Sequence, residues 1–238
     1  MGRGLQMILD FHCGGGGAAM GYHREGFDIL GIDHKKKRNY PFPQIKVDIP
    51  TFIRETPIEW FQEFDLIHTS PPCQKYTRAA KLAPSQGNKV SEIDHIQLMR
   101  EFLIRTEVPY VIENVEGAPL NGVKICGSSF ALRVRRHRIF EANFPIKSLK
   151  CQHQEQGKPV GIYGSMGDTV QGTCSKTGAY VIGGSTAKDI EEAQNAMGID
   201  WLGWSDLKES VPPFYTQHIA KCFKKWRANI NEQKRSIR

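Results

Sequence analysis

Residues 6–25 read QMILDFHCGGGGAAMGYHRE, and this segment predicts the fold of the chain. It begins with an apolar run suited to a buried strand, passes through four consecutive glycines and ends in an amphipathic helical pattern. Further apolar runs at residues 28–32, 65–69 and 108–112 alternate with helical stretches. Strands that are buried on both faces and separated by helices are typical of parallel sheets. The sequence therefore predicts an α/β protein with a doubly wound, mostly parallel sheet.

The domain organisation follows from a change in composition along the chain. The whole chain has 238 residues and is 39% hydrophobic, which is enough to build a core. Residues 1–140 are expected to form the main α/β unit, whereas glycine and polar residues dominate residues 141–190, where we expect a small insertion of strands and loops. Residues 191–238 are expected to return to the main unit and to end in a basic tail. The helices expected in or near this last part cover residues 190–196, 204–209 and 215–229.

Charge is concentrated at the carboxyl-terminal end. The formal net charge is +7, and residues 221–238 contain seven Lys or Arg and only one acid, Glu232. Such a segment is compatible with a polyanionic partner such as nucleic acid, and a solvated tail is the alternative. The sequence shows no signal segment and no run of membrane-spanning length. We therefore expect an intracellular, cytoplasmic protein, a monomer without a membrane partner.

The six cysteines do not follow a disulfide framework, so free thiols in a reducing compartment are expected. A metal site is conceivable from Cys126, Cys151, His153 and Cys174. The paired Cys-x-x-Cys spacing of structural zinc sites is missing, however, so the sequence does not predict a metal site.

The glycine-rich turn predicts a ligand site at one end of the sheet. Glycines between a strand and a helix let the backbone approach a ligand, and the following helix start favours an anionic group. Asp33 follows the second strand and suits the hydroxyls of a ribose, while Asp48 follows the next run and suits an adenine amino group. These residues predict a cofactor that carries a nucleoside. The alternative is a tight turn with capping carboxylates.

A second group of residues predicts chemistry. Pro71-Pro72-Cys73-Gln74 follows a strand-like run and precedes a polar loop, which places a thiol where a nucleophile would be expected. A buried structural cysteine is the alternative. Glu113 and Asn114 follow another predicted strand, at the edge where open α/β sheets build their sites. Arg136 and Arg138 add fixed positive charge near that edge, with a helix cap and surface charge as the alternative roles for Glu113 and the arginines.

The order of these motifs, completed by Val211-Pro212-Pro213-x-Tyr215, resembles the DNA (cytosine-5) methyltransferase family. The size is most similar to the small members found in phages and prophages. The resemblance implies the class I S-adenosylmethionine-dependent methyltransferase fold, S-adenosylmethionine as cofactor, and a cytosine of double-stranded DNA as substrate. It also implies a bacterial or phage-infected host cell and a role such as restriction-modification.

The resemblance further implies a role for each matching residue. Cys73 would add to carbon 6 of cytosine, Glu113 would protonate or hydrogen-bond N3, Asn114 would shape the pocket, and Arg136 and Arg138 would hold the flipped base. The residues expected to bind the cofactor are Asp10, Phe11, His12, Cys13, Gly14, Gly16, Gly17, Asp33, Asp48, Ile49, Pro71 and Tyr215. Those expected to contact DNA are Gln74, Tyr76, Arg78 and Lys81, in a loop over residues 75–92.

Two positions depart from the family pattern: His12 stands where the family usually has an aromatic residue, and Val134 stands where it usually has glutamine. Three alternatives remain open. Cytosine-5 methylation of tRNA uses related motifs, and an inactive paralogue would only bind nucleic acid. Amino-group methyltransferases share the two prolines but carry an aromatic residue at the position of Cys73, which disfavours that class.

Overall fold

A seven-stranded sheet forms the centre of the computed structural model, which describes residues 6–76, 93–167 and 186–236. The strand order is β3-β2-β1-β4-β5-β7-β6, with β1 to β5 parallel and β7 antiparallel to both of its neighbours. The doubly wound, mostly parallel sheet predicted from the sequence is therefore confirmed. The strands are β1 (Met7–Phe11), β2 (Asp28–Asp33), β3 (Gln44–Lys46), β4 (Leu66–Thr69), β5 (Tyr110–Asn114), β6 (Val123–Ile125) and β7 (Arg138–Ala142).

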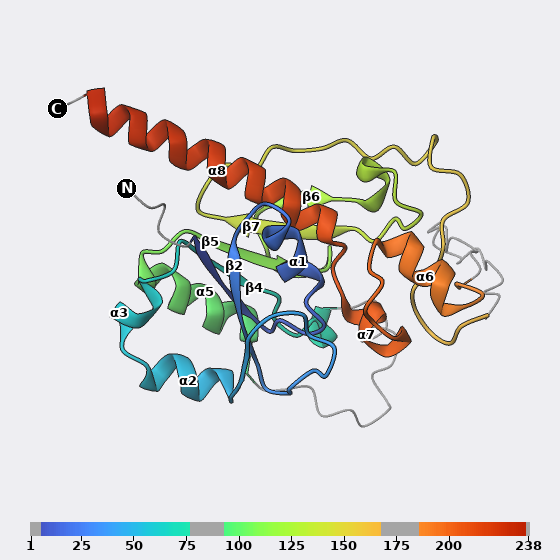
Figure 1. Ribbon diagram of the computed structural model, residues 1–238, viewed down its shortest axis with the longest axis horizontal. Coiled ribbons are helices and arrows are strands. Elements are labelled where there is room, and N and C mark those ends of the chain that lie inside the picture. Colours follow the sequence, from blue (N-terminus) through green and yellow to red (C-terminus); the bar gives the residue numbers. More distant parts are fainter. Residues whose placement is uncertain (1–5, 77–92, 168–185, 237–238) are drawn as a thin grey trace.

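Helices cover both faces of the sheet (Figure 1). Successive residues of a strand point to opposite faces, so Ile8 of β1 packs with α1 and α8, whereas Leu9 packs with α2, α3 and α5. The same alternation separates Leu66 from Ile67 in β4. Two apolar layers therefore hold the sheet. The helices are α1 (Gly17–His23), α2 (Ile49–Glu55), α3 (Ile58–Phe61), α5 (His95–Thr106), α6 (Ile190–Met197), α7 (Trp204–Glu209) and α8 (Pro213–Ser236), with single 3₁₀ turns η1 (Gln74–Tyr76) and η2 (Gly127–Phe130).

Several element boundaries differ from the prediction. Strand β5 continues through Asn114, so Glu113 and Asn114 belong to the strand and do not follow it. Strand β7 crosses the expected boundary at residue 140 because its antiparallel pairing with β5 continues to Ala142. Helix α8 begins at Pro213, where a proline is well tolerated because the first helical N–H has no partner within the helix. Between β7 and α6, the described residues contain one isolated bridge, Gly161 to Thr186.

Helix α8 returns to the amino-terminal unit and packs along α1. The hydroxyl of Thr216 donates to the carbonyl of Ala18 at 2.7 Å, and a Cβ at Gly21 would overlap the carbonyl of Pro213. Glycine at this position is thus required by the close approach of two helices. The contact places the segment before α8 beside the glycine-rich loop, where Val211 and Ser210 lie close to Gly17.

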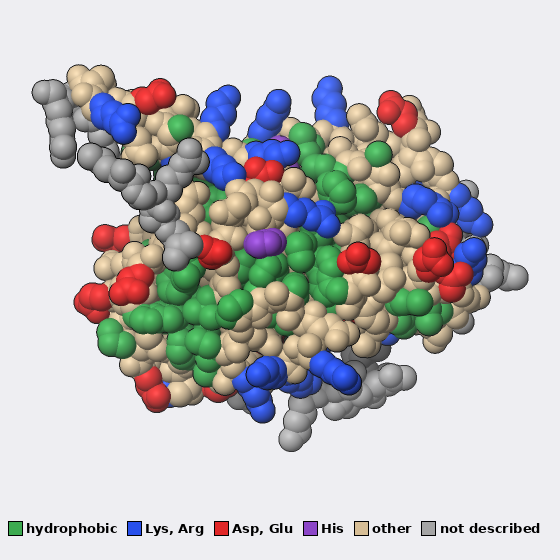
Figure 2. All heavy atoms as spheres, in the orientation of Figure 1, with side chains coloured by type: hydrophobic (Ala, Val, Ile, Leu, Met, Phe, Trp, Pro, Cys, Tyr) green, Lys and Arg blue, Asp and Glu red, His purple; other side chains and the backbone are tan. Residues whose placement is uncertain are grey.

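The far end of α8 projects beyond the sheet (Figure 1). Lys and Arg side chains lie along the edge of the molecule on which α8 runs (Figure 2). Part of this charge is compensated locally. Lys221 and Lys224 form ion pairs with Glu25, and Arg227 pairs with Asp65 at 2.6 Å. In the described part of the chain, no helix has the length and apolar character needed to cross a membrane.

Candidate active site

The candidate site lies at the carboxyl ends of β1, β4 and β5. Strand β1 pairs with β2 on one side and with β4 on the other, so the connections leave this point in opposite directions. Open α/β sheets bind ligands in the crevice that such a reversal creates. The glycine-rich loop follows β1, and Cys73 lies four residues beyond the end of β4. Both predicted sites therefore share one edge of the sheet.

The loop that carries Cys73 is tied to the neighbouring strand end. The side-chain amide of Asn114 donates to the carbonyl of Pro71 at 2.8 Å, and its oxygen accepts from the backbone N–H of Val115 at 2.9 Å. Asn114 is almost fully buried, so both bonds are shielded from water. This residue fixes the Cys73 loop against the end of β5.

Glu113, near the carboxyl end of β5, lies beside Arg138, the first residue of β7. The side chain of Glu113 is only 7% exposed, and its Oε1 atom lies 2.9 Å from Nε of Arg138. Burial raises the pKa of Glu113, and this effect exceeds the opposing effects of Arg138, Ser70 and Arg136. The environment therefore favours the protonated carboxyl more than water does, which suits a proton donor.

Arg136 is held by contacts from the carboxyl-terminal part of the chain. Its backbone has a φ of +20°, and its carbonyl accepts from the hydroxyl of Tyr215 at 2.9 Å. Its guanidinium donates to the carbonyl of Lys208, while Nε is buried without a hydrogen-bond partner among the described residues. Burial, followed by repulsion from Arg138, lowers the pKa of Arg136 to about 9. An anionic or hydrogen-bond-accepting ligand would relieve this unpaired cation.

A cavity of about 440 Å³ opens above these groups. Cys73 is half-buried at its wall, and burial raises the pKa of its thiol, with a smaller contribution from Glu113 opposed by Arg138 and Arg136. The volume falls in the range of small-molecule sites. Among the described residues, the lining contains four cationic side chains and no acidic one. The lining residues are Cys73, Val115, Val134, Arg135, Arg136, Arg138, Pro159, Val160, Gly161, Ile162, Tyr163 and Lys208.

The glycine-rich loop encloses a much smaller cavity, of about 40 Å³. Asp10 lies on its wall, and neither carboxylate oxygen has a hydrogen-bond partner among the described residues. Burial, followed by repulsion from Asp33 and Glu113, raises the pKa of Asp10 well above its usual value. A buried acid without partners is costly unless a ligand supplies a donor or a positive charge.

Other residues predicted to bind a cofactor have contacts within the loop. Oδ2 of Asp33 accepts from the backbone N–H of Gly14 at 2.9 Å, and Sγ of Cys13 accepts from Nε2 of Gln44 at 3.2 Å. Gly16 has a φ of +83°, which favours glycine, and Gly17 begins α1. The alternative of a tight turn thus accounts for part of this segment.

Three further residues that were predicted to bind the cofactor have structural roles in the fold. The ring of Phe11 is buried among Phe52, Phe61 and Phe102, and Ile49 is buried in the same layer. Asp48 caps α2 by accepting from the backbone N–H of Thr51 at 3.1 Å.

His12 has a φ of +53° and lies 3.0 Å from the hydroxyl of Thr69 through Nδ1. Burial, with repulsion from His95, lowers the pKa of His12 to about 3 and keeps the ring neutral. Tyr215, which the sequence also places on the cofactor side, contacts the Arg136 segment instead of lining the small cavity.

The residues expected to contact DNA are described only in part. The hydroxyl of Tyr76 donates to Oδ2 of Asp94 at 2.7 Å and anchors the start of the loop to the cap of α5. The side chain of Gln74 and the whole of Arg78 and Lys81 lie outside the described residues.

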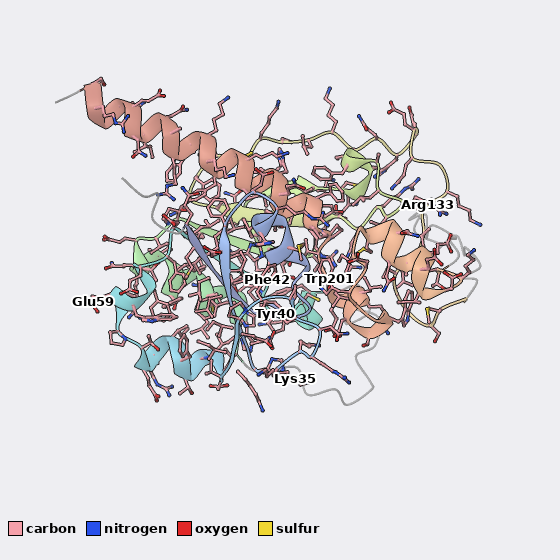
Figure 3. The ribbon with its side chains drawn as sticks, viewed as in Figure 1. Lys35, Tyr40, Phe42, Glu59, Arg133 and Trp201 are labelled. Carbon is pink, nitrogen blue, oxygen red and sulfur yellow. The ribbon has the colours of Figure 1, made fainter. Side chains whose placement is uncertain are left out.

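The structure adds residues to the site that sequence patterns did not reveal. Glu209 and Ser210 close one side of the small cavity, beside Val211 of the Val211-Pro212-Pro213-x-Tyr215 motif. The indole of Trp201 donates to the carbonyl of Gly15 at 2.9 Å from the side of α6 and α7 (Figure 3). Glu209, Ser210 and Trp201 come from a part of the chain almost two hundred positions away, and no local motif marks them.

Comparison with solved structures identifies the fold. The chain superposes on a triple mutant of DNMT2 from Spodoptera frugiperda with a TM-score of 0.58 and 14% identity, covering 92% of this chain and 99% of that one. The superposition on the Dnmt2 methyltransferase of S. pombe has a TM-score of 0.57 and 15% identity, and it covers 92% of this chain and 98% of that one. The superposition on the methyltransferase EhMeth of Entamoeba histolytica has a TM-score of 0.54 and 14% identity, and it covers 93% of this chain and 98% of that one.

These likenesses show that the chain has the class I S-adenosylmethionine-dependent methyltransferase fold, as the sequence predicts. Comparison with protein-family models gives no match, and neither does comparison with curated proteins.

Proposed function

We propose that this chain transfers a methyl group from S-adenosylmethionine to carbon 5 of a cytosine in double-stranded DNA through a covalent bond to Cys73. One observation carries the proposal: Cys73, Arg136 and Arg138 line a single cavity at the sheet edge, with Glu113 ion-paired to Arg138 beneath it. A nucleophile, a buried acid and fixed cations around one hollow are the groups that addition to a pyrimidine ring needs.

S-adenosylmethionine supplies the electrophilic methyl group when it is bound. The donor set near the glycine-rich loop suits this molecule, because Asp10 offers a buried carboxylate without partners and the molecule carries positive charge. The cavity of about 40 Å³ has room only for a few water molecules, so binding requires the segment around Glu209 to Val211 or the loop itself to move outward. We assign Asp10 and the backbone of Gly14 to Gly17 to this site.

The remaining chemistry belongs to side chains of this protein. The thiolate of Cys73 adds to carbon 6 of the flipped base, and the proton of Glu113 passes to N3 as electrons move into the ring. Carbon 5 becomes nucleophilic and takes up the methyl group, whose bond to the sulfonium sulfur breaks. Water takes up the proton from carbon 5, the Cys73 thiolate is expelled, and N3 returns its proton to the Glu113 carboxylate, which restores the aromatic ring. Arg136 and Arg138 stabilise negative charge that develops during addition.

The cationic wall of the cavity supports a nucleic-acid substrate. Arg135 and Lys208 lie on the lining together with Arg136 and Arg138. Such a concentration of positive charge attracts phosphate groups and raises the rate of encounter with a polyanion. We therefore propose double-stranded DNA as the partner, with the base turned out of the helix into the cavity.

The test is methyl incorporation from labelled S-adenosylmethionine into unmethylated duplex DNA, with tRNA assayed alongside. We expect label in DNA as 5-methylcytosine for the natural protein and for Cys222→Ser, a half-buried cysteine of α8, and no label for Cys73→Ala. Label in tRNA alone would transfer the proposal to RNA, and label in neither substrate would overturn it.

A trapping experiment isolates the covalent step. A duplex with 5-fluorocytosine cannot lose a proton from carbon 5, so the adduct should accumulate and survive denaturation. Cys73→Ala should give no such adduct while it still binds the cofactor. An adduct that persists in this variant would place the nucleophile elsewhere.

A further inference from the structure

Four side chains of the metal-binding type meet beside the β6–β7 hairpin. The ligand atoms of Cys126, His137, Cys151 and His153 all lie within 4.8 Å of one another. Sγ of Cys126 is 3.2 Å from Nε2 of His153, and Sγ of Cys151 is 3.5 Å from Nε2 of His137. In a tetrahedral zinc site, with Zn–S near 2.3 Å and Zn–N near 2.0 Å, neighbouring ligand atoms are about 3.3–3.8 Å apart. The four groups are therefore close to the spacing that Zn²⁺ requires.

The ligands come from three places that the fold brings together. Cys126 directly follows β6, and His137 directly precedes β7, so the hairpin pairing sets these two side by side. Cys151 and His153 belong to the chain that follows β7. Because no pair has the Cys-x-x-Cys spacing and His137 lies within the arginine motif, spacing in the sequence does not reveal the cluster. Cys174, the other cysteine considered from the sequence, lies outside the described residues.

The groups around the cluster are those that support bound zinc. Nδ1 of His137 lies 3.3 Å from Oε2 of Glu116, which leaves Nε2 free to face Cys151. A carboxylate behind a ligating histidine fixes the ring and increases its basicity. The hydroxyl of Ser128 donates to Sγ of Cys126 at 3.1 Å, and such a donor stabilises a thiolate.

We propose that Cys126, His137, Cys151 and His153 bind one Zn²⁺ in a closed, tetrahedral structural site. Two thiolates and two neutral imidazoles balance the charge of the ion, and binding releases the two thiol protons, one of which now points from Cys126 to the carbonyl of Arg135. Four protein ligands leave no open position, which distinguishes the site from a catalytic one.

The position of His137 gives the metal a second consequence. His137 lies between Arg136 and Arg138, which line the cavity above Cys73. A metal bond to His137 would hold this short segment, in which Arg136 has a strained φ of +20°. It would also join the hairpin to the chain after β7, which supplies Pro159 to Tyr163 to the cavity wall. The ion is therefore assigned to the positioning of the arginines and has no role in the reaction itself.

The test uses the full-length protein without a histidine tag, purified in reducing buffer. Elemental analysis should give about one zinc per chain for the natural protein and for Cys222→Ser. Cys222 is a matched control because its Sγ lies 3.8 Å from Nε2 of His218, a Cys–His pair outside the cluster. Cys151→Ser, which changes an exposed ligand, should lose the metal or bind it at least tenfold more weakly.

Replacement of the metal by Co²⁺ gives an independent readout, because thiolate ligands produce a charge-transfer absorption band. The band should appear in the natural protein and be weakened in Cys151→Ser. Equal metal content in all three proteins, or a Cys126–Cys151 disulfide in place of metal in the reduced protein, would overturn the proposal.

A measurement on the natural chain covers the case in which Cys151→Ser does not fold. Bound zinc should protect the thiol of Cys151 from alkylation, and a chelator should remove the protection and lower the melting temperature. Identical alkylation rates with and without chelator would overturn the site, whatever the methyltransferase activity.

Discussion

The cavity above Cys73 and the small cavity at the glycine-rich loop lie on the same sheet edge but differ in how complete they are. The first has about 440 Å³ and is bordered by Arg138, which is ion-paired with Glu113, and by Arg136, whose guanidinium keeps a hydrogen bond to the carbonyl of Lys208 although its Nε has no partner among the described residues. The second has about 40 Å³ and contains Asp10, whose carboxylate has no partner among the described residues. The comparison indicates that the Cys73 side is organised during folding, whereas the glycine-rich side is completed by its ligand.

The largest effect should come from the acid of the organised site. Glu113→Gln keeps the shape of the side chain but cannot deliver a proton, so kcat should fall about 10²–10⁴-fold. Glu59→Gln is the matched control, because Glu59 is exposed on α3 at the far margin of the molecule (Figure 3), and it should leave kcat unchanged. Equal activity of the two variants would show that Glu113 is only a structural partner of Arg138.

The next effect concerns the incomplete site. Asp10→Asn should weaken cofactor binding about 10- to 100-fold, because a charged hydrogen-bond acceptor is lost. At a pH above the pKa of Asp10, the same change should raise the melting temperature of the ligand-free protein, because it removes a buried acid that has no hydrogen-bond partner among the described residues.

The pH dependence of that stability gain has a definite sign. Folding raises the pKa of Asp10, so its destabilising contribution is absent below the pKa of the unfolded chain and is complete above the pKa of the folded protein. The gain of Asp10→Asn should therefore grow as pH rises through that interval. Calorimetry at several pH values measures it, and a lower melting temperature at every pH would show that the carboxylate has a structural partner.

A smaller effect is expected from the ionisation of Cys73. Burial raises the pKa of this thiol, so less thiolate is present at neutral pH than for an ordinary cysteine. If thiolate attack limits the reaction, kcat/KM should rise about tenfold per pH unit below that pKa. The pH–rate profile of the natural protein tests this, and a flat profile from about pH 7 to about pH 9 would mean that substrate binding changes the ionisation or that another step limits the rate.

The smallest effect concerns the backbone of the glycine-rich loop. Gly16→Ala places a Cβ at a φ of +83° and about 3.0 Å from Tyr40 and Pro41, so unfolding should become easier by about 1–3 kcal/mol. Gly26→Ala is the matched control, because its φ is +84° but no atom lies within 4 Å of the new Cβ. Denaturant titration should show the smaller loss for Gly26→Ala, and equal losses would mean that the loop yields to the added methyl group.

The sequence predicted the organised site better than the incomplete one, and topology explains why. Cys73 and Glu113 lie at or just beyond the carboxyl ends of adjacent parallel strands, which must meet at one edge. On the other side, an acid after a strand can bind a ligand or cap a helix, and Asp48 does the latter in the structure. Phe11 was expected at the cofactor but lies in the apolar core. Successive side chains of a strand point to opposite faces of the sheet, so the ring of Phe11 points away from the face to which Asp10 points.

Long-range contacts could not be predicted from local patterns. The bond from Tyr215 to Arg136 spans 79 positions, and that from Trp201 to Gly15 spans 186. The meeting of Cys126 and His137 with Cys151 and His153 depends likewise on the pairing of β6 with β7. Such contacts arise from tertiary packing, for which a single sequence gives no periodic signal.

The two hydrogen bonds of Asn114 have a consequence for the entropy of the reaction. By joining the carbonyl of Pro71 to the start of the chain after β5, they remove the relative motion of the thiol-bearing loop and the strand that carries Glu113. The freedom lost in aligning these two groups is then lost once, when the chain folds, and not again in every turnover. In the proposed reaction, a base that enters the cavity meets a pair of groups whose separation is already set.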